Sequence, residues 1–167
     1  MVKTVTGTDN LLLADVKLHL YVDITEDDTL IQSYIDASLS AAANYMHKDV
    51  LLTEYDASAK EIQDYRFIID MALDKVTITD NSIEIILEQY EFTQYDGQLA
   101  FDYYYDALEA VKGVSGYDVI PANVNQARML LIGSWYANRE ANITTATSAK
   151  LPVGVEFILD SEADGAI

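Results

Sequence analysis

The chain has 167 residues, half of them hydrophobic, which is enough to bury the core of one ordinary domain. It holds 28 acidic against 10 basic residues, so its formal net charge of −18 disfavours binding to nucleic-acid phosphates. The absence of cysteine excludes a disulfide framework and a thiol nucleophile. No apolar run approaches the ~20 residues of a membrane span, and the N-terminus lacks the apolar core of a signal peptide. We therefore expect a soluble protein made in the cytoplasm of its host cell.

Helical periodicity is strongest near the two ends of the chain. A helix is predicted over about residues 26–47, where Thr25 and Asp28 fit a capping box and apolar residues then recur every three or four positions. A shorter helix over about residues 11–21 precedes it. Another long helix is predicted from Pro121, which suits a first helical turn, to about Asn142.

The middle of the chain has a mixed pattern. Residues 55–73 have an apolar spacing compatible with a helix, whereas β-branched residues and alternation from Val76 to Phe92 predict strands. The dipeptide Asp96-Gly97 predicts a hairpin turn between Tyr95 and Gln98. The predicted fold is mainly α, a small helical bundle with a β-hairpin insertion at residues 76–110, and thus α+β overall. We expect one domain over residues 1–167.

Catalytic and metal-binding signatures are missing from the sequence. It contains no Walker loop and no GxGxxG, GxSxG or HExxH pattern. The acidic run at residues 23–28 lacks the glycine and glutamate of an EF-hand loop, and acids at the start of a helix explain it. His47 suits the end of a helix, and His19, between two leucines, fits a packed or surface side chain. We therefore predict no enzyme, no cofactor and no metal site.

The C-terminal region combines a polar stretch at residues 143–149 with an apolar segment at residues 151–159. An apolar segment behind a polar loop has little reason to stay apolar unless a partner buries it. Residues 150–167 are therefore predicted to be a docking segment.

Several stretches near both ends of the chain, taken together, resemble the head–tail connector proteins of tailed phages. They stand in the family's order and include a "Leu-Pro-x-Gly-hydrophobic" ending and a helix that ends in an aromatic–Tyr–x–x–Arg–Glu pattern. These stretches are residues 13–23, 26–31, 41–45, 121–127, 130–140, 151–155 and 157–159. Residues 51–118 depart from the family, because they are longer and more acidic than its usual hairpin.

The resemblance implies a structural subunit of the virion neck. Connectors of this kind form a ring, commonly twelve-fold, below the portal vertex of the capsid. They join the portal protein to the stopper or tail-terminator protein and leave a channel through which DNA passes. The implied assembly is a homo-dodecamer with no cofactor, no membrane contact and no sequence-specific binding of nucleic acid. Family members dock on the portal near their C-terminus, so the candidate portal-docking residues are Leu151, Pro152, Val153, Phe157, Ile158 and Leu159.

Trp135, Tyr136 and Arg139 are candidate anchors between subunits, because tryptophan, tyrosine and arginine dominate interface hot spots. Packing of Trp135 in the core of its own subunit is an equal alternative. The acidity also fits a protein of another class, an acidic DNA mimic or inhibitor that occupies a basic groove as a monomer or dimer. A hydrolase is a third alternative, for which the sequence offers no active-site constellation.

Overall fold

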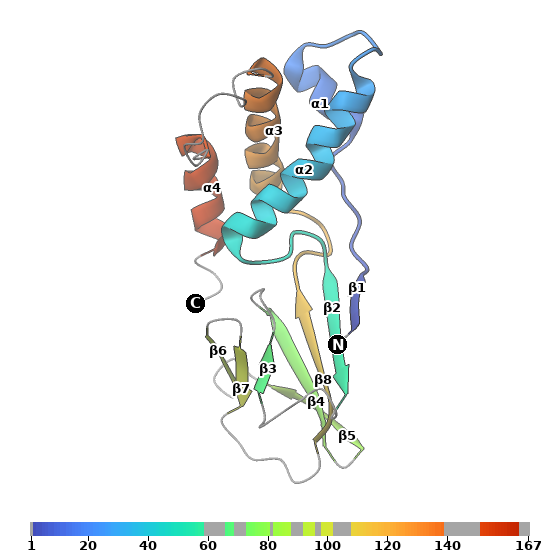
Figure 1. Cartoon of the computed structure of the whole chain (residues 1–167), viewed down its shortest axis with the longest axis vertical. Helices are drawn as coiled ribbons and strands as arrows, with labels where there is room; N and C mark the ends of the chain where they lie inside the picture. Colours follow the sequence, from blue (N-terminus) through green and yellow to red (C-terminus); the bar gives the residue numbers. More distant parts are fainter. Residues whose placement is uncertain are drawn as a thin grey trace. The chain divides into compact units, whose positions relative to one another are not determined.

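The computed structural model describes residues 2–58, 66–68, 73–80, 82–87, 92–95, 98–101, 108–138 and 151–163. They belong to two compact units (Figure 1). The sheet unit comprises residues 1–8 and 47–119, and the helical unit comprises residues 9–46 and 120–165. The expected single domain over residues 1–167 stays a prediction.

The helical unit contains α1 (Leu13–Leu20), α2 (Asp28–Met46), α3 (Ala122–Ala137) and α4 (Val153–Ala163). Helix α3 packs against α2 and α4, and α1 packs against α2. Apolar residues at helical spacing on α1, α2 and α3 meet in the core, because burying one face of each helix removes that face from water. The core cluster is formed by Leu11, Val16, Ile31, Ile35 and Ile132.

The three predicted helices are confirmed with shifted ends. Helix α2 begins at Asp28, because its first hydrogen bond runs from the Ile31 amide to the Asp27 carbonyl (2.9 Å). It ends at Met46, and His47 follows with a left-handed φ of 50°. Helix α3 follows Pro121 as expected but ends at Ala137. Helix α4, which begins just after Pro152, was not predicted as a helix.

The sheet unit contains a five-stranded antiparallel sheet with the order β1-β2-β8-β4-β5. These strands are β1 (Val2–Val5), β2 (Thr53–Ser58), β8 (Leu108–Ser115), β4 (Lys75–Asp80) and β5 (Ile83–Leu87). A second antiparallel sheet has the order β3-β7-β6. Its strands are β3 (Arg66–Ile68), β7 (Gln98–Phe101) and β6 (Phe92–Tyr95).

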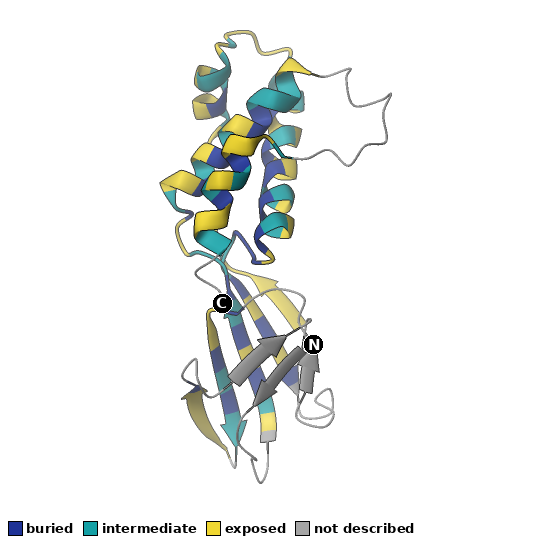
Figure 2. Cartoon of the chain, turned by 90° about the vertical axis from the view of Figure 1, so that its left-hand side faces the viewer, coloured by how far each residue is buried: buried dark blue, intermediate teal, exposed yellow. Residues whose placement is uncertain are grey.

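Burial alternates along the central strands of the five-stranded sheet, as the dark and light bands of Figure 2 show. Side chains on one face are buried, and residues paired across neighbouring strands share that face. This face carries Thr53, Tyr55, Ala57, Val76, Ile78, Leu87, Val111 and Ser115. The opposite face carries exposed and half-buried residues, polar and charged ones such as Glu54, Asp56 and Lys112 as well as apolar ones such as Val114, and is the outward face of the sheet.

The predicted α+β class is confirmed, but a mainly α fold with a single hairpin is not, because the described residues also form two sheets. Residues 53–58 and 66–68 are strands, although the apolar spacing of residues 55–73 is compatible with a helix. The insertion at residues 76–110 is more than one hairpin, because it supplies strands to both sheets. Tyr95 and Gln98, on either side of the predicted turn, pair at the end of β6 and β7; the turn residues Asp96 and Gly97 lie outside the described residues. No helix within the described ranges is long and apolar enough to span a membrane.

Candidate assembly surfaces

Helix α4 has an exposed side and a buried side. The Val155 and Glu156 amides donate to the Pro152 carbonyl (2.8 and 3.1 Å), which starts the helix directly after the proline. Val155 and Leu159, four residues apart, are both 1% exposed and face the core of the helical unit. Val153 and Phe157 have the same spacing but are 81% and 79% exposed. The helix therefore presents two large apolar side chains to solvent.

The six candidate docking residues divide between these two sides. Pro152 is exposed like Val153 and Phe157, whereas Leu151 and Ile158 are half-buried. Leu159 is buried within its own subunit, so it holds α4 in place rather than presenting a contact. We define the candidate docking surface as Leu151, Pro152, Val153 and Phe157, on the first half of α4 and the two residues before it.

Hydrogen bonds fix the second half of α4 to its neighbours. The Tyr45 hydroxyl of α2 donates to Asp160 (2.6 Å), and the Asn123 amide of α3 donates to Glu162 (2.5 Å). The bond to Asp160 raises the pKa of the Tyr45 hydroxyl to about 12, since ionised tyrosine would be repelled by the carboxylate. These bonds hold the docking surface on a helix that is anchored at its other end.

The candidate anchors at the end of α3 have partners within the helical unit. The Trp135 ring lies 5.9 Å from the Tyr34 ring, at an interplanar angle of 54°. The Tyr136 hydroxyl donates to Asp27 (2.5 Å) at the start of α2. Both side chains are half-buried, which favours a role in the fold of the subunit. Arg139 lies outside the described residues.

A buried arginine that sequence analysis did not single out joins three segments of the helical unit. Arg128 of α3 is fully buried, and its two terminal nitrogens donate to the two carboxylate oxygens of Asp9 (2.8 and 2.6 Å). Its other donors reach Ser38 Oγ (3.0 Å), Asn125 Oδ1 (2.9 Å) and the Ile35 carbonyl (3.4 Å). All five N–H groups of the guanidinium are thus satisfied. The one sequence signal was a charged residue within the apolar stripe of α3.

The partner of this arginine has a shifted acidity. Burial by itself would raise the pKa of Asp9, but hydrogen bonds from Arg128 and from the Leu11 amide, together with the guanidinium charge, outweigh it. The net result is a pKa below the ordinary value of a carboxyl group. Asp9 therefore stays ionised in the folded protein at a lower pH than an ordinary aspartate does.

A second ionic cluster lies in the sheet unit, where the chain enters β2. Asp49 is buried and accepts hydrogen bonds from Lys3 Nζ (3.0 Å) and the Tyr55 hydroxyl (2.5 Å). Burial and the Asp49 carboxylate raise the pKa of Tyr55 to about 12. Burial lowers the pKa of Lys3, but its bonds to Asp49 and Tyr55 outweigh this effect, and the net shift is upward. The cluster ties β1 and β2 to the segment that follows α2.

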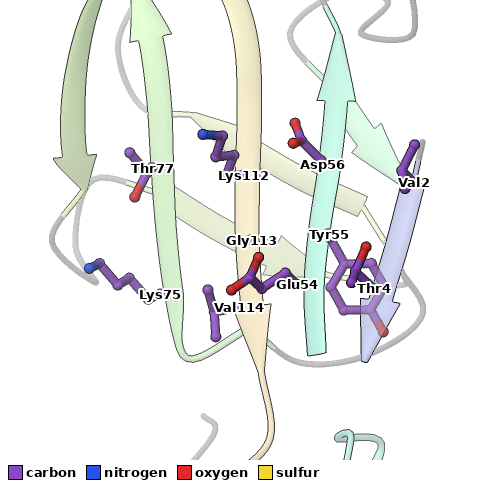
Figure 3. Close-up of a pocket in the computed structure, with 10 residues that line it drawn as sticks. All are labelled: Val2, Thr4, Glu54, Tyr55, Asp56, Lys75, Thr77, Lys112, Gly113 and Val114. Carbon is purple, nitrogen blue, oxygen red and sulfur yellow. The ribbon is translucent and has the colours of Figure 1, made fainter. Parts of the chain in front are cut away.

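The outward face of the five-stranded sheet contains a hollow of about 340 Å³ (Figure 3). Its lining comes from β1, β2, β4 and β8: Val2, Thr4, Glu54, Tyr55, Asp56, Lys75, Thr77, Lys112, Gly113 and Val114. The two lysines stand on β4 and β8, and the two acids stand on β2 (Figure 3). We name this region the sheet hollow.

The connection between α1 and α2 is fixed by one lysine. Lys17 Nζ donates to the Ile24 carbonyl (2.7 Å) and pairs with Asp28 (2.5 Å). The Val22 amide donates to the Lys17 carbonyl (3.0 Å), and Tyr21 closes α1 with a left-handed φ of 56°. The connection therefore has a defined shape although it is a loop. We name residues 21–26 the acidic turn.

Comparison with known proteins gives one family and one fold. The phage gp6-like head-tail connector protein family matches residues 10–93, half of the chain. No curated protein matches the sequence of this chain. A chain of the neck of an empty gene transfer agent (GTA) particle, computed with C6 symmetry, and a chain of a native GTA virion are similar in fold. For both, the TM-score is 0.52 at 14% identity, over 96% of this chain and 94% of the other. Because the family match spans half of its length, the chain belongs to the phage gp6-like head–tail connector family and is a structural connector subunit.

Proposed function

We propose that the chain forms a ring of twelve copies in the virion neck, between the portal vertex and the stopper or tail-terminator protein. The observation that carries the proposal is the family match over residues 10–93. The fold it shares with a chain of a GTA neck supports a place in a neck. That particle was computed with C6 symmetry, and twelve copies are compatible with a six-fold axis.

The docking surface on α4 is the proposed contact with the portal protein. Val153 and Phe157 are large, apolar and exposed, while Val155 and Leu159 keep the helix seated on α2 and α3. Burial of an exposed valine or phenylalanine side chain in a partner groove contributes about 2 kcal/mol each. An amphipathic helix laid in a groove is a common mode of recognition, and its anchors recur at four-residue spacing as these two do.

The net charge of −18 supports a channel that DNA crosses without binding to its wall. A ring of like-charged subunits repels the phosphate backbone, so DNA would pass through its channel without adhering. The role is structural, with no sequence-specific contact to nucleic acid and no catalytic step.

Reconstitution with a cognate portal protein tests the proposal. The chain and the portal are mixed, and particles are imaged by negative-stain electron microscopy, with the mass of the complex measured in solution. Rings of this chain stacked on the portal are the expected result. Phe157→Ala should weaken their formation by about tenfold or more, while Leu130→Ala, an exposed leucine of α3, serves as the matched control.

A chain that stays monomeric beside the portal and instead binds a basic protein would overturn the proposal. That outcome would favour the acidic-mimic alternative.

A further inference from the structure

Among the lysines and arginines whose side chains the structure describes, two have no close acid, and both lie in one place. Lys3, Lys17, Lys48 and Arg128 each have an acid within 3.0 Å. Lys112 has only a longer contact, 3.5 Å to Glu84, and no described acid pairs with the exposed Lys75. Both of these lysines line the sheet hollow (Figure 3). The hollow holds two acids and two bases, so it is formally neutral in a chain of net charge −18.

The sheet hollow also has an apolar rim. Val2 is 63% exposed on β1, and Val114 is half-buried on β8. A partner that fits this surface needs carboxylates for the lysines and apolar side chains for the valines.

The acidic turn of the helical unit carries both kinds of group. Asp23 and Glu26 are exposed and have no described ion-pair partner, and Tyr21 and Ile24 are 93% and 55% exposed. Leu18, just before it, is exposed as well. Because Lys17 fixes the shape of the turn, little conformational entropy is lost when it binds. Within the described residues, the helical unit has no unpaired lysine or arginine to oppose it.

We propose that the acidic turn of one copy docks in the sheet hollow of the next copy, with Asp23 and Glu26 against Lys75 and Lys112. The occupant is thus a second copy of this chain. The contact is heterologous, because two different surfaces meet, and such contacts build closed rings when the rotation between copies closes. The inference rests on the proposed ring and names its subunit contact.

Charge complementarity gives a reason why two copies can associate although each is strongly acidic. Two random faces of a chain with net charge −18 repel each other, whereas a turn with two acids meets two lysines in the hollow. The acids of the hollow, Glu54 and Asp56, stand on β2; Asp56 is opposite Lys112 of β8 in the strand register, and β8 separates both acids from Lys75 of β4. Salt should therefore weaken the contact, since these charges are at the surface.

The absence of cysteine allows a clean cross-linking test. Thr25→Cys places a thiol in the acidic turn and Thr77→Cys places one in the sheet hollow, and both threonines are accessible in part or in full. Under mild oxidation, the double variant should give a ladder of dimers, trimers and larger species on non-reducing gels. A mixture of the two single variants should stop at dimers, and each single variant alone should stay monomeric. The reaction is run on free protein and on protein bound to the portal.

Charge reversal tests the named side chains. Lys75→Glu with Lys112→Glu should cut the cross-linking yield about tenfold or more, and so should Asp23→Lys with Glu26→Lys. The four changes together should restore it, which a folding defect would not do. Dimers from Thr77→Cys alone would mean that two hollows face each other and would overturn the proposal, as would the absence of any ladder.

The outcomes separate this inference from the proposed function. Rings on the portal that are insensitive to both charge reversals would refute the contact and leave the ring intact. A cross-linked ladder from a chain that never binds the portal would support the contact and refute the neck position.

Discussion

Asp9 and Arg128 are 119 residues apart in the chain, and their side chains form a two-pronged ion pair at 2.8 and 2.6 Å in the helical unit. The guanidinium is fully buried, and it also holds Ser38 of α2 and Asn125 of α3. One side chain therefore fixes the segment before α1 to the middle of two helices.

Removal of one partner of this pair should be costly. Asp9→Asn leaves a buried guanidinium without its counter-charge, so we expect the free energy of unfolding to fall by about 3–5 kcal/mol. Urea denaturation followed by circular dichroism measures the loss. Glu84→Gln, which removes the exposed partner of Lys112, is the matched control and should change stability by less than about 1 kcal/mol. Equal effects of the two substitutions would contradict the interpretation that the Asp9–Arg128 ion pair stabilises the fold because it is buried.

Acid should destabilise the helical unit through the same carboxylate. The pKa of Asp9 is lowered by folding, so its contribution is present above the unfolded value of 3.8 and is lost as pH falls through the lower folded value. We expect wild-type stability to decline below about pH 4. In the Asp9→Asn variant this part of the decline should be missing when the free energy of unfolding is measured against pH. If that free energy fell with pH in parallel to the wild type, Asp9 would not titrate in this way.

Alkali should destabilise the sheet unit. Tyr55 ionises at about pH 12 when folded and near 10 when unfolded, so ionisation above pH 10 favours the unfolded chain. The raised pKa of Lys3 acts in the same sense, because its contribution is present below the unfolded value of 10.5 and is lost as pH rises through the folded value. The free energy of unfolding should therefore fall between pH 8 and 12, and it should fall less steeply in the Tyr55→Phe variant. Tyr45→Phe controls for the other raised tyrosine.

Leu159 and Phe157 should separate stability from binding. Leu159→Ala opens a cavity in the helical unit and should lower the free energy of unfolding by about 2–4 kcal/mol. Phe157→Ala, on the exposed side of the same helix, should change it by less than about 0.5 kcal/mol. Thermal or urea unfolding compares the two. Were Phe157→Ala as destabilising as Leu159→Ala, the exposed side of α4 would be a buried one.

Two glycines differ in whether their position can accept a side chain. Gly116 has a φ of +95°, its amide donates to Asp74 (3.0 Å), and a Cβ there would lie 2.3 Å from the Leu51 carbonyl oxygen. Gly116→Ala should therefore cost about 2–4 kcal/mol of stability. Gly154 of α4 has no atom within 4 Å of such a Cβ, so Gly154→Ala should be neutral or stabilising by up to about 1 kcal/mol. Urea denaturation of both variants checks the contrast.

Local patterns predicted the helices because each helix depends on neighbours in sequence. The period of apolar residues located α2 and α3, and the prolines at 121 and 152 stand where α3 and α4 begin. The helical form of residues 153–163 was missed, since a nine-residue apolar run holds too few turns to distinguish a helix from an extended docking segment. The strand at residues 53–58 was not predicted, and the region was considered compatible with a helix, because the two-residue alternation of Tyr55 and Ala57 is short and surrounded by polar residues.

The candidate surfaces were predicted only as a segment of sequence. Composition placed an apolar docking segment at residues 150–167, but it did not separate Phe157, which is exposed, from Leu159, which is buried. That distinction depends on which side of α4 meets α2 and α3. The sheet hollow was not predicted at all, because its lysines come from β4 and β8 and its acids from β2.

The sequence by itself determined the acidity, the absence of cysteine, the three predicted helices and the resemblance to head–tail connectors. These are properties of composition and of residues close in the chain. Only the tertiary structure showed the five-stranded sheet, in which β8 lies between β2 and β4, and the ion pair between Asp9 and Arg128. Such pairings join residues tens of positions apart, and they are selected by burial and hydrogen bonding in the whole fold rather than by any local pattern.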